Sequence, residues 1–533
     1  MEEQNKKAAE GCSLWFWIIL AAGIIVRINY ALCASVDLDE GFTFFFAQPA
    51  LADILKISPL HDPYHPPVYY MFIHIMQLVS ASVIWLRLPS LLCGAAAIWI
   101  SYLIGRSLKG EGTGLLLAFA RAFLLTAILN DCQIRSYGPM NLGVLLCLLG
   151  IVNILKHKAP FRIGKLSEGL CWLLFYITVW ATAWIGYLGC AFVGSAALLF
   201  ILAPKNTANR NKTVCICLAA VLTVFLWLGR TYLGVPTGAP KNYFFSFAKL
   251  CDLFFIPTHF FVFNTNFSAC GRELVHSFLR SAADFAGNLF FWSALICGAV
   301  KFYREQRDIA KFIIFAPLLP IAVFYIFSIF NIVTFQLRYI YVFYIPAVFL
   351  IFSGIEGGIS VNWLKKLLYT IIGAVLIYNF SVTAFLPGLP YYWNQDWRKI
   401  ISFIVENKTD KDVIFLFVPY TKYAFACNYA HGKVGFGVNE DNSAFIYPKE
   451  NYDKLDFTDI TAPMLTDRLF EVLKGRRIFL ILNQAEMKRR EAEEITDILS
   501  SRYKAEKDLV QAGNEYWSCM RIILLTPKEQ LEK

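Results

Sequence analysis

The first 387 residues alternate between long apolar blocks and short polar segments. Each block has about 18–22 residues, the length that an α-helix needs to cross a hydrocarbon core of about 30 Å. Helices are predicted because a helix satisfies its own backbone hydrogen bonds in lipid. The blocks are 13–33, 86–107, 113–130, 137–156, 169–186, 187–203, 213–231, 284–301, 312–330, 338–356 and 366–386. We therefore predict an all-α polytopic membrane bundle of about eleven spans.

One further apolar stretch, 66–85, decides the topology of everything after it. If it does not cross and the N-terminus is cytoplasmic, the basic residues between later spans all face the cytoplasm, as membrane proteins prefer. These residues are Arg106, Lys109, Lys156, Lys158, Arg162, Lys165, Lys205, Arg210, Lys212, Lys301, Arg304, Arg307, Lys311, Lys365 and Lys366. We therefore predict that 66–85 is a juxtamembrane or re-entrant helix at the outer interface. The C-terminal tail then emerges outside, and the block 13–33 is a retained span.

Residues 388–533 have the composition of a soluble domain. Apolar runs predict three short buried strands, and amphipathic patterns predict two helices. The strands are Asp412–Val418, Arg476–Leu482 and Arg521–Thr526, and the helices are Asp396–Lys408 and Glu486–Tyr503. We predict two domains: a transmembrane domain (1–387) with an outer loop at 34–85, and a small extracytoplasmic α/β domain (388–533).

Composition supports a membrane protein and excludes two other classes. Hydrophobic residues make up 57% of the chain and charged residues 17%, against about 45–50% and 25% in soluble proteins. The net charge of +10 would suit nucleic acid, but the basic residues lie in short segments between spans, so no nucleic-acid partner is predicted. None of the 14 cysteines forms a C-x-x-C pair, which argues against a zinc ribbon or redox site.

The first outer loop carries the candidate chemistry. Asp37, Asp39 and Glu40 follow the first span directly, and ionisable groups near membrane depth are functional candidates. Solvated interfacial charge is the alternative explanation. Further along, the proline pair after His65 permits a helix to start at Pro67. His65 would then face the same water as Asp39. Histidine and carboxylates suit divalent cations, so a metal stays open, although metal-ligand spacing is missing.

Taken in order, these motifs resemble the dolichyl-phosphate-mannose protein mannosyltransferase-like superfamily. That group has the C-type membrane glycosyltransferase fold and includes the aminoarabinose transferases of lipid A. The resemblance begins with an acidic pair after the first span and a His-Pro-Pro-x-Tyr-Tyr segment. It covers about 400 residues, through Asp39-Glu40, His65 to Tyr70, Arg87-Leu88-Pro89-Ser90, Gln133-Ile134-Arg135-Ser136-Tyr137, Arg338-Tyr339 and Asp396-Trp397-Arg398.

The resemblance implies transfer of a monosaccharide from a polyprenyl-phosphate carrier to a glycan, lipid or protein acceptor of the cell envelope, with inversion. Asp39 would be the base that takes the acceptor proton, and Glu40 would act beside it by positioning the loop or the acceptor. Arginines bind phosphate through paired hydrogen bonds and stabilise the leaving group. Arg338 and Arg135, with Tyr339, are therefore expected to bind the donor phosphate.

A second group of residues is expected to position the acceptor or a metal: His65, Asp131 and Gln133. The metal itself stays unknown, and no cofactor is required apart from a divalent cation that is left open. The family variant implies a bacterial plasma membrane as the location, with the catalytic loop outside. The donor, the acceptor and membrane lipids are the expected partners.

Two departures from the family put part of this assignment in doubt. The acid of its Glu-x-Arg segment is Gln133 here, and the segment from Ala181 to Trp184 lacks its histidine. Two other functions stay open, a lipid-linked glycan flippase or transporter and a ligase or polymerase of lipid-linked glycans. Transporters need polar groups within spans and often have repeated halves. This chain has its polar clusters in outer loops, which favours the transferase.

Overall fold

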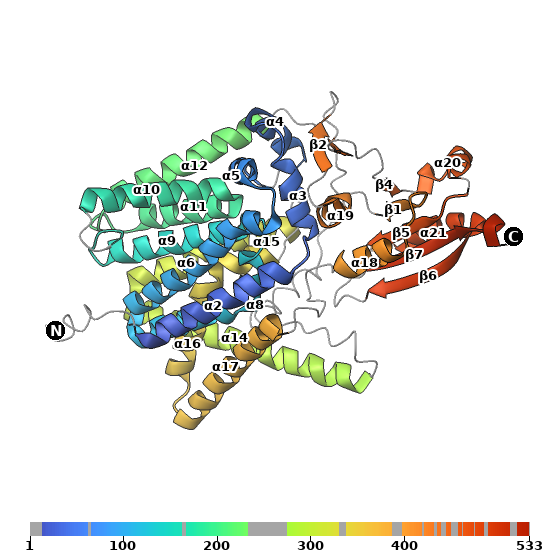
Figure 1. The fold of residues 1–533 in the computed structure, drawn as a ribbon. Helices are drawn as coiled ribbons and strands as arrows, with labels where there is room; N and C mark the ends of the chain where they lie inside the picture. The colour runs from blue at the N-terminus through green and yellow to red at the C-terminus, as the bar shows by residue number, and fades with distance from the viewer. Residues whose placement is uncertain are drawn as a thin grey trace.

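The computed structural model describes most of the chain in two parts, a helical bundle and a smaller domain with a β-sheet at one end of it (Figure 1). The described residues are 13–61, 65–161, 167–232, 274–329, 337–385, 397–417, 421–430, 434–438, 444–448, 457–460, 462–473, 475–483, 489–511 and 520–531. The predicted domain boundary at 387/388 falls outside them.

The bundle is built from helices, as predicted. Its elements are α2 (Leu14–Cys33), α3 (Leu38–Phe46), α4 (Leu51–His61), α5 (Val68–Val79), α6 (Val83–Lys109), α7 (Glu111–Phe123), α8 (Leu125–Asp131), α9 (Tyr137–Leu155), α10 (Glu168–Ile185), α11 (Tyr187–Leu202), α12 (Arg210–Tyr232), α14 (Leu274–Glu305), α15 (Arg307–Ile329), η2 (Leu337–Phe343), α16 (Tyr344–Gly358) and α17 (Asn362–Phe385). This is a polytopic membrane protein.

Among the described residues, eight helical segments are long and apolar enough to cross a membrane. Each coincides with one of the predicted spans. They are Leu14–Cys33, Val83–Lys109, Tyr137–Leu155, Glu168–Ile185, Arg210–Gly229, Phe285–Glu305, Arg307–Phe327 and Ile340–Gly358.

The other three predicted spans have a different structure or are only partly described. The span 113–130 is divided into α7 and α8, because Leu124 adopts an extended conformation with ψ 126°. The span 187–203 forms α11, which has 16 residues. The span 366–386 lies in α17, whose side chains are described only up to residue 377.

Within 66–85, the helix α5 is too short to cross a bilayer. Its 12 residues give a length of about 18 Å at 1.5 Å per residue, against a hydrocarbon core of about 30 Å. It begins directly after Pro67, close to the predicted start. The geometry therefore agrees with a helix that lies at the interface and leaves the predicted topology intact.

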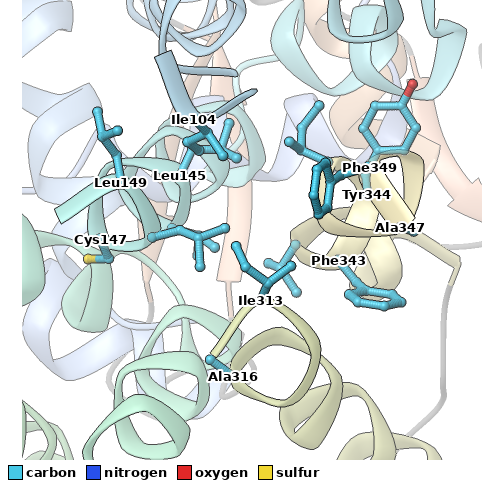
Figure 2. Close-up of a cluster of buried hydrophobic side chains, with 14 of the residues drawn as sticks. Ile104, Leu145, Cys147, Leu149, Ile313, Ala316, Phe343, Tyr344, Ala347 and Phe349 are labelled. Carbon is cyan, nitrogen blue, oxygen red and sulfur yellow. The ribbon is translucent and has the colours of Figure 1, made fainter. Parts of the chain in front are cut away.

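The centre of the bundle is η2 with α16. In the most apolar window of Ile340–Gly358, 89% of the residues are buried inside the protein, against 22% in Arg210–Gly229, which belongs to α12. The core around this segment joins elements far apart in sequence. Figure 2 shows part of it, with Ile104 of α6, Leu145 of α9 and Ile313 of α15 around the same interior as α16.

α14 and α16 make the closest helix contact in the bundle. A Cβ atom at Gly298 would lie 1.8 Å from the carbonyl oxygen of Leu350, and one at Gly354 would lie 1.9 Å from that of Ala294. Small residues let membrane helices approach closely, since van der Waals packing drives their association. The two glycines therefore allow α14 to pack directly on the central helix.

The smaller domain is built around a five-stranded mixed sheet of order β4-β1-β5-β7-β6. Strand β1 pairs in parallel with β4 and β5, whereas β7 pairs antiparallel with β5 and β6. The strands are β1 (Val413–Phe417), β4 (Phe457–Ile460), β5 (Ile478–Asn483), β6 (Tyr503–Gln511) and β7 (Met520–Pro527), and β2 (Val434–Val438) and β3 (Ala444–Pro448) form a separate hairpin. The predicted α/β class of this domain is confirmed.

Helices complete the domain and join it to the bundle. They are α18 (Trp397–Asn407), α19 (Thr421–Ala430), α20 (Asp467–Val472), α21 (Arg489–Arg502) and α22 (Lys528–Leu531). The predicted helices correspond to α18 and α21. Trp397 is fully buried against Phe425, with ring centroids 5.9 Å apart, so this tryptophan is a core residue of the domain. α19 lies between the sheet and α3 of the bundle (Figure 1).

Candidate active site

The acidic segment after the first span forms the start of α3. Asp37 is the N-cap: its Oδ1 accepts a hydrogen bond from the Glu40 amide at 2.7 Å, and its own amide donates to Glu40 Oε2 at 3.3 Å. This reciprocal pair is a capping box, which satisfies backbone groups at the start of a helix. The Asp37-Leu38-Asp39-Glu40 sequence therefore fixes the direction of α3 by local chemistry.

Glu40 is buried and fully engaged. Its side chain is 0% exposed and accepts from Arg87 Nε at 2.8 Å and Arg87 Nη2 at 2.6 Å, and from the Ile134 amide at 2.8 Å. A bidentate arginine–carboxylate pair is strong and geometrically specific. The resemblance groups Glu40 with Asp39 as the catalytic acidic pair and expects it to act either there or by positioning the loop or the acceptor. The burial fits its other expected role, positioning, and does not favour contact with a substrate.

Arg87 also holds the chain that joins α2 to α3. Its guanidinium donates to the carbonyl oxygens of Ala31, Ala34 and Ser35 at 2.7, 2.9 and 3.0 Å. One turn further along α6, Ser90 Oγ donates to the Arg135 carbonyl at 3.3 Å. The Arg-Leu-Pro-Ser segment thus positions both the acidic loop and the 133–137 turn.

Asp39 faces away from this buried pair. Its side chain is 28% exposed, and its Oδ1 lies 3.5 Å from Nη2 of Arg135. The side chain of Arg135 is 6% exposed. Arg135 Nη1 also donates to Thr43 Oγ1 at 3.1 Å, and that hydroxyl donates to the Asp39 carbonyl at 3.1 Å. The site therefore combines a water-accessible carboxylate with a guanidinium held in a fixed orientation.

Asp37 and Gln133 form a second polar pair beside Asp39. Gln133 Nε2 donates to Asp37 Oδ2 at 2.6 Å. Burial, together with the neighbouring carboxylates of Glu40 and Asp39, raises the pKa of Asp37 from 3.8 to about 8. Desolvation and like charges both disfavour an ionised carboxyl. Both effects favour the protonated form of Asp37. Gln133 contacts this carboxyl, and its expected role in positioning an acceptor or a metal stays a prediction.

His65 lies at the edge of the same site. The ring centroids of His65 and Tyr137 are 6.3 Å apart. The guanidinium carbon of Arg135 lies over the Tyr137 ring, 5.8 Å from its centroid. Across the part of the chain that the structure describes, no three His, Cys, Asp or Glu side chains gather in a group that could hold a metal ion. The sequence left metal dependence open, and it stays open here.

Asp131 is at the centre of a separate buried network. Its carboxylate accepts from Arg27 Nε at 2.9 Å, Arg121 Nη2 at 2.8 Å and Tyr341 Oη at 3.0 Å. All three charged side chains are at most 1% exposed. The structure therefore does not bring Asp131 to the exposed carboxylate, although the sequence expected it to position acceptor or metal. It joins α2, α7 and η2 behind the 133–137 turn.

The expected phosphate ligands Arg338 and Tyr339 lie in the first turn of η2. Their side chains are outside the described residues. Two residues on, Tyr341 is buried and reaches Asp131, so η2 is anchored to the network next to the 133–137 turn. Both residues stay predictions for donor binding.

Sequence reasoning gave no site role to several residues that build the site, although one of them, Arg87, lies in the Arg-Leu-Pro-Ser motif. Arg27, Arg87 and Arg121 lie within or at the edge of apolar blocks, and a charge in such a block signals an internal partner. The sequence therefore contains a signal for these three arginines. Thr43 and Asn428 have no comparable signal, because a single uncharged Thr or Asn among apolar residues is ordinary and only the folded chain brings them to the acidic loop.

A scan against protein-family models finds no match, and neither does a search of curated protein sequences. Solved structures do match. ArnT from Cupriavidus metallidurans, in the apo state, is 12% identical with a TM-score of 0.48, covering 96% of this chain and 97% of that one. Its complex with undecaprenyl phosphate is 12% identical with a TM-score of 0.47 and coverages of 96% and 98%.

The Archaeoglobus fulgidus oligosaccharyltransferase, in complex with Zn and sulfate, is also similar. It is 12% identical with a TM-score of 0.45, and the alignment covers 96% of this chain and 75% of that one. ArnT is an aminoarabinose transferase, and both proteins are membrane glycosyltransferases of the C-type fold.

Proposed function

We propose that this protein is a membrane glycosyltransferase that moves a monosaccharide from a polyprenyl-phosphate carrier to a cell-envelope acceptor, a glycan, lipid or protein. The observation that carries the proposal is the pair formed by Asp39 and Arg135, a partly exposed carboxylate 3.5 Å from a nearly buried guanidinium. Sugar transfer needs a base for the acceptor hydroxyl and a cation for the leaving phosphate. The pair supplies both at one end of a membrane bundle.

In the proposed reaction the acceptor oxygen attacks the anomeric carbon and forms the new glycosidic bond. The bond from that carbon to the phosphate oxygen breaks, and the phosphate leaves with the electron pair. Asp39 takes the proton of the acceptor hydroxyl, and attack from the face opposite the phosphate gives inversion. Arg135 lies ready to stabilise the charge on the departing phosphate, with Arg338 and Tyr339 as further expected ligands.

The charge distribution supports an outer location for this site. α6 has 27 residues, a length of about 40 Å. It begins at Val83, close to Arg87 and the acidic loop, and ends at Lys109. At that far end Lys109 pairs with Glu305 at 3.2 Å, and Lys156 donates to the Ser107 carbonyl. Basic residues favour the cytoplasmic side. The acidic loop and the C-terminal domain would therefore lie outside the cytoplasm.

The test compares the purified protein with two aspartate variants in detergent. Wild type, Asp39→Asn and Asp53→Asn are incubated with a panel of polyprenyl-phosphate sugars and candidate acceptors, and free polyprenyl phosphate is measured by mass spectrometry. Asp53 is the matched control, because it is 52% exposed on the neighbouring α4 and pairs only across the surface with Lys56. Removal of a general base lowers the rate by about 10²–10⁴-fold, so only Asp39→Asn should lose release.

Wild-type rates in a correctly inserted Asp39→Asn protein would overturn the assignment of the base. The donor panel also includes a lipid-linked oligosaccharide. Release from that donor alone would favour a ligase or polymerase instead. Movement of lipid-linked sugar across liposomes that contain only this protein, without release from any donor, would favour the flippase.

A further inference from the structure

The C-terminal domain contacts the acidic segment directly through α19. Gly41 of α3 lies so close that a Cβ atom there would be 2.8 Å from the Ala424 amide nitrogen and 2.8 Å from the Tyr423 carbonyl carbon. The rings of Phe42 and Tyr423 also pack, with centroids 4.5 Å apart. α3 and α19 are thus in backbone contact, and Figure 1 shows them side by side between bundle and sheet.

Asn428 of α19 makes a paired hydrogen bond to the backbone of Val36. Its Oδ1 accepts from the Val36 amide at 3.1 Å, and its Nδ2 donates to the Val36 carbonyl at 2.8 Å. Nδ2 also donates to the Ala424 carbonyl on its own helix at 2.8 Å. These three bonds define the orientation of the amide, because a flipped amide would oppose oxygen to oxygen.

Val36 is where such a contact has most effect on the acidic loop. It is 4% exposed and precedes the N-cap Asp37, so its backbone groups lie outside the hydrogen-bond ladder of α3. Buried backbone groups need a partner, and Asn428 provides one for both. From the other side, Arg87 of α6 holds Ser35 and Glu40. The segment is held between the membrane bundle and the C-terminal domain.

We propose that Asn428 is a positioning residue for the transfer reaction. By holding the Val36 backbone, the C-terminal domain sets the start of α3 and hence the position of Asp39 opposite Arg135. Catalysis depends steeply on such placement, and a shift of about 1 Å can cost about 100-fold in rate. The inference rests on the proposed role of Asp39, whereas the contact between the two domains does not.

The test uses the full-length protein with Asn428→Ala and the matched control Asn407→Ala. Asn407 is in the same domain, at the end of α18, and its Nδ2 also donates to a carbonyl of its own helix, that of Phe403 at 2.7 Å. Two experiments are made on each variant. The first measures amide hydrogen exchange over residues 34–46, and the second measures kcat and KM for polyprenyl-phosphate release. A melting curve of each variant reports folding.

Asn428→Ala should lose protection over residues 34–46 by about tenfold, since it removes the partner of both Val36 groups. Its kcat should fall about 10- to 100-fold with little change in the donor KM, whereas Asn407→Ala should match wild type in both. Asn428→Asp keeps an acceptor for the Val36 amide but places a carboxylate oxygen against the Val36 and Ala424 carbonyl oxygens, so it should lose at least as much as Asn428→Ala.

Wild-type exchange in Asn428→Ala would overturn the contact itself. Altered exchange with unchanged kcat would overturn the positioning role. If wild type releases no polyprenyl phosphate from any donor, the proposed function fails while the exchange result still tests the contact. A loss of protection throughout the C-terminal domain, with a lower melting temperature, would assign Asn428 a role in domain stability only and contradict the proposal.

Discussion

At the scale of single residues, Asp37 makes the protein sensitive to pH. Its pKa of about 8 lies above the value of 3.8 expected for an exposed aspartate. Between these two values the unfolded chain gives up the proton and the folded protein keeps it. The free energy of unfolding therefore falls as pH rises from about 4 to about 8 and then levels off.

The matched variant is Asp37→Asn, which is neutral at every pH and still caps a helix well. We expect the melting temperature of wild type to fall relative to that of Asp37→Asn between pH 5 and pH 8, with a constant difference above that. Thermal unfolding of both proteins in one detergent across this range measures the effect. Parallel curves for the two proteins would contradict a raised pKa.

Single residues also show how far sequence reasoning reaches into the site. Asp39, Gln133 and Arg135 were predicted from motifs, and the structure brings the 133–137 turn, which carries Gln133 and Arg135, against the start of α3, which carries Asp39. Burial could not be predicted in the same way, because adjacent acidic residues look alike in sequence. Glu40 is next to Asp39, yet it is directed inward to Arg87 while Asp39 meets water. That difference arises from the tertiary partners of Glu40, since Arg87 and the Ile134 amide are distant in sequence and meet it only in the folded chain.

At the scale of elements, the crossing of α14 and α16 predicts that an added methyl group destabilises the protein at the crossing but not elsewhere on α14. Gly298→Ala or Gly354→Ala would place a Cβ atom within 2 Å of a carbonyl oxygen on the partner helix. Backbone on both sides leaves no flexible group to move aside. We expect each variant to lower the free energy of unfolding by about 1–3 kcal/mol or more, as measured by thermal unfolding in detergent.

The control for this prediction is Gly287→Ala on α14, the helix that also contains Gly298. Apart from its chain neighbours and its own helix backbone, no atom of the described residues lies within 4 Å of a Cβ atom at that position. Alanine also favours helix by up to about 1 kcal/mol over glycine. Gly287→Ala should therefore be neutral or stabilising. Equal losses at all three positions would indicate that helix propensity, and not the crossing, controls stability here.

The elements themselves were predicted best where they are most apolar. The strands β1, β5 and β7 are central in the sheet and appear in the sequence as apolar runs. The missed strands β4 and β6 are its two edges, where polar residues are common and no apolar run forms. In the membrane bundle, the extended residue Leu124 divides a continuous apolar block, and no Pro or Gly marks the break.

At the scale of the whole molecule, the two ends of the bundle should be distinguishable by chemistry from one side of the membrane. Ser500 is exposed on α21 of the C-terminal domain, and Gly112 is exposed at the start of α7, next to the Lys109 end. In a cysteine-free background, we expect a membrane-impermeant maleimide added to intact cells to label Ser500→Cys and to spare Gly112→Cys.

Labelling after the membrane is permeabilised provides the control, since both cysteines should then react. The reverse pattern in intact cells would place the acidic loop on the cytoplasmic side and contradict the proposed location. Equal labelling of both before permeabilisation would mean that the spans between them do not have the predicted topology. Sidedness in this protein depends on 66–85 staying at the interface, as the short α5 suggests.

The contact between Val36 and Asn428 joins residues 392 positions apart, which has a consequence for the order in which the protein is made. A ribosome completes the acidic loop early, but its partner helix is synthesised only after every predicted span. During that interval the Val36 backbone, which precedes these carboxylates, lacks the Asn428 amide that holds it in the folded protein. The site is therefore completed last, and a truncated or stalled chain would be inserted in the membrane without an assembled centre.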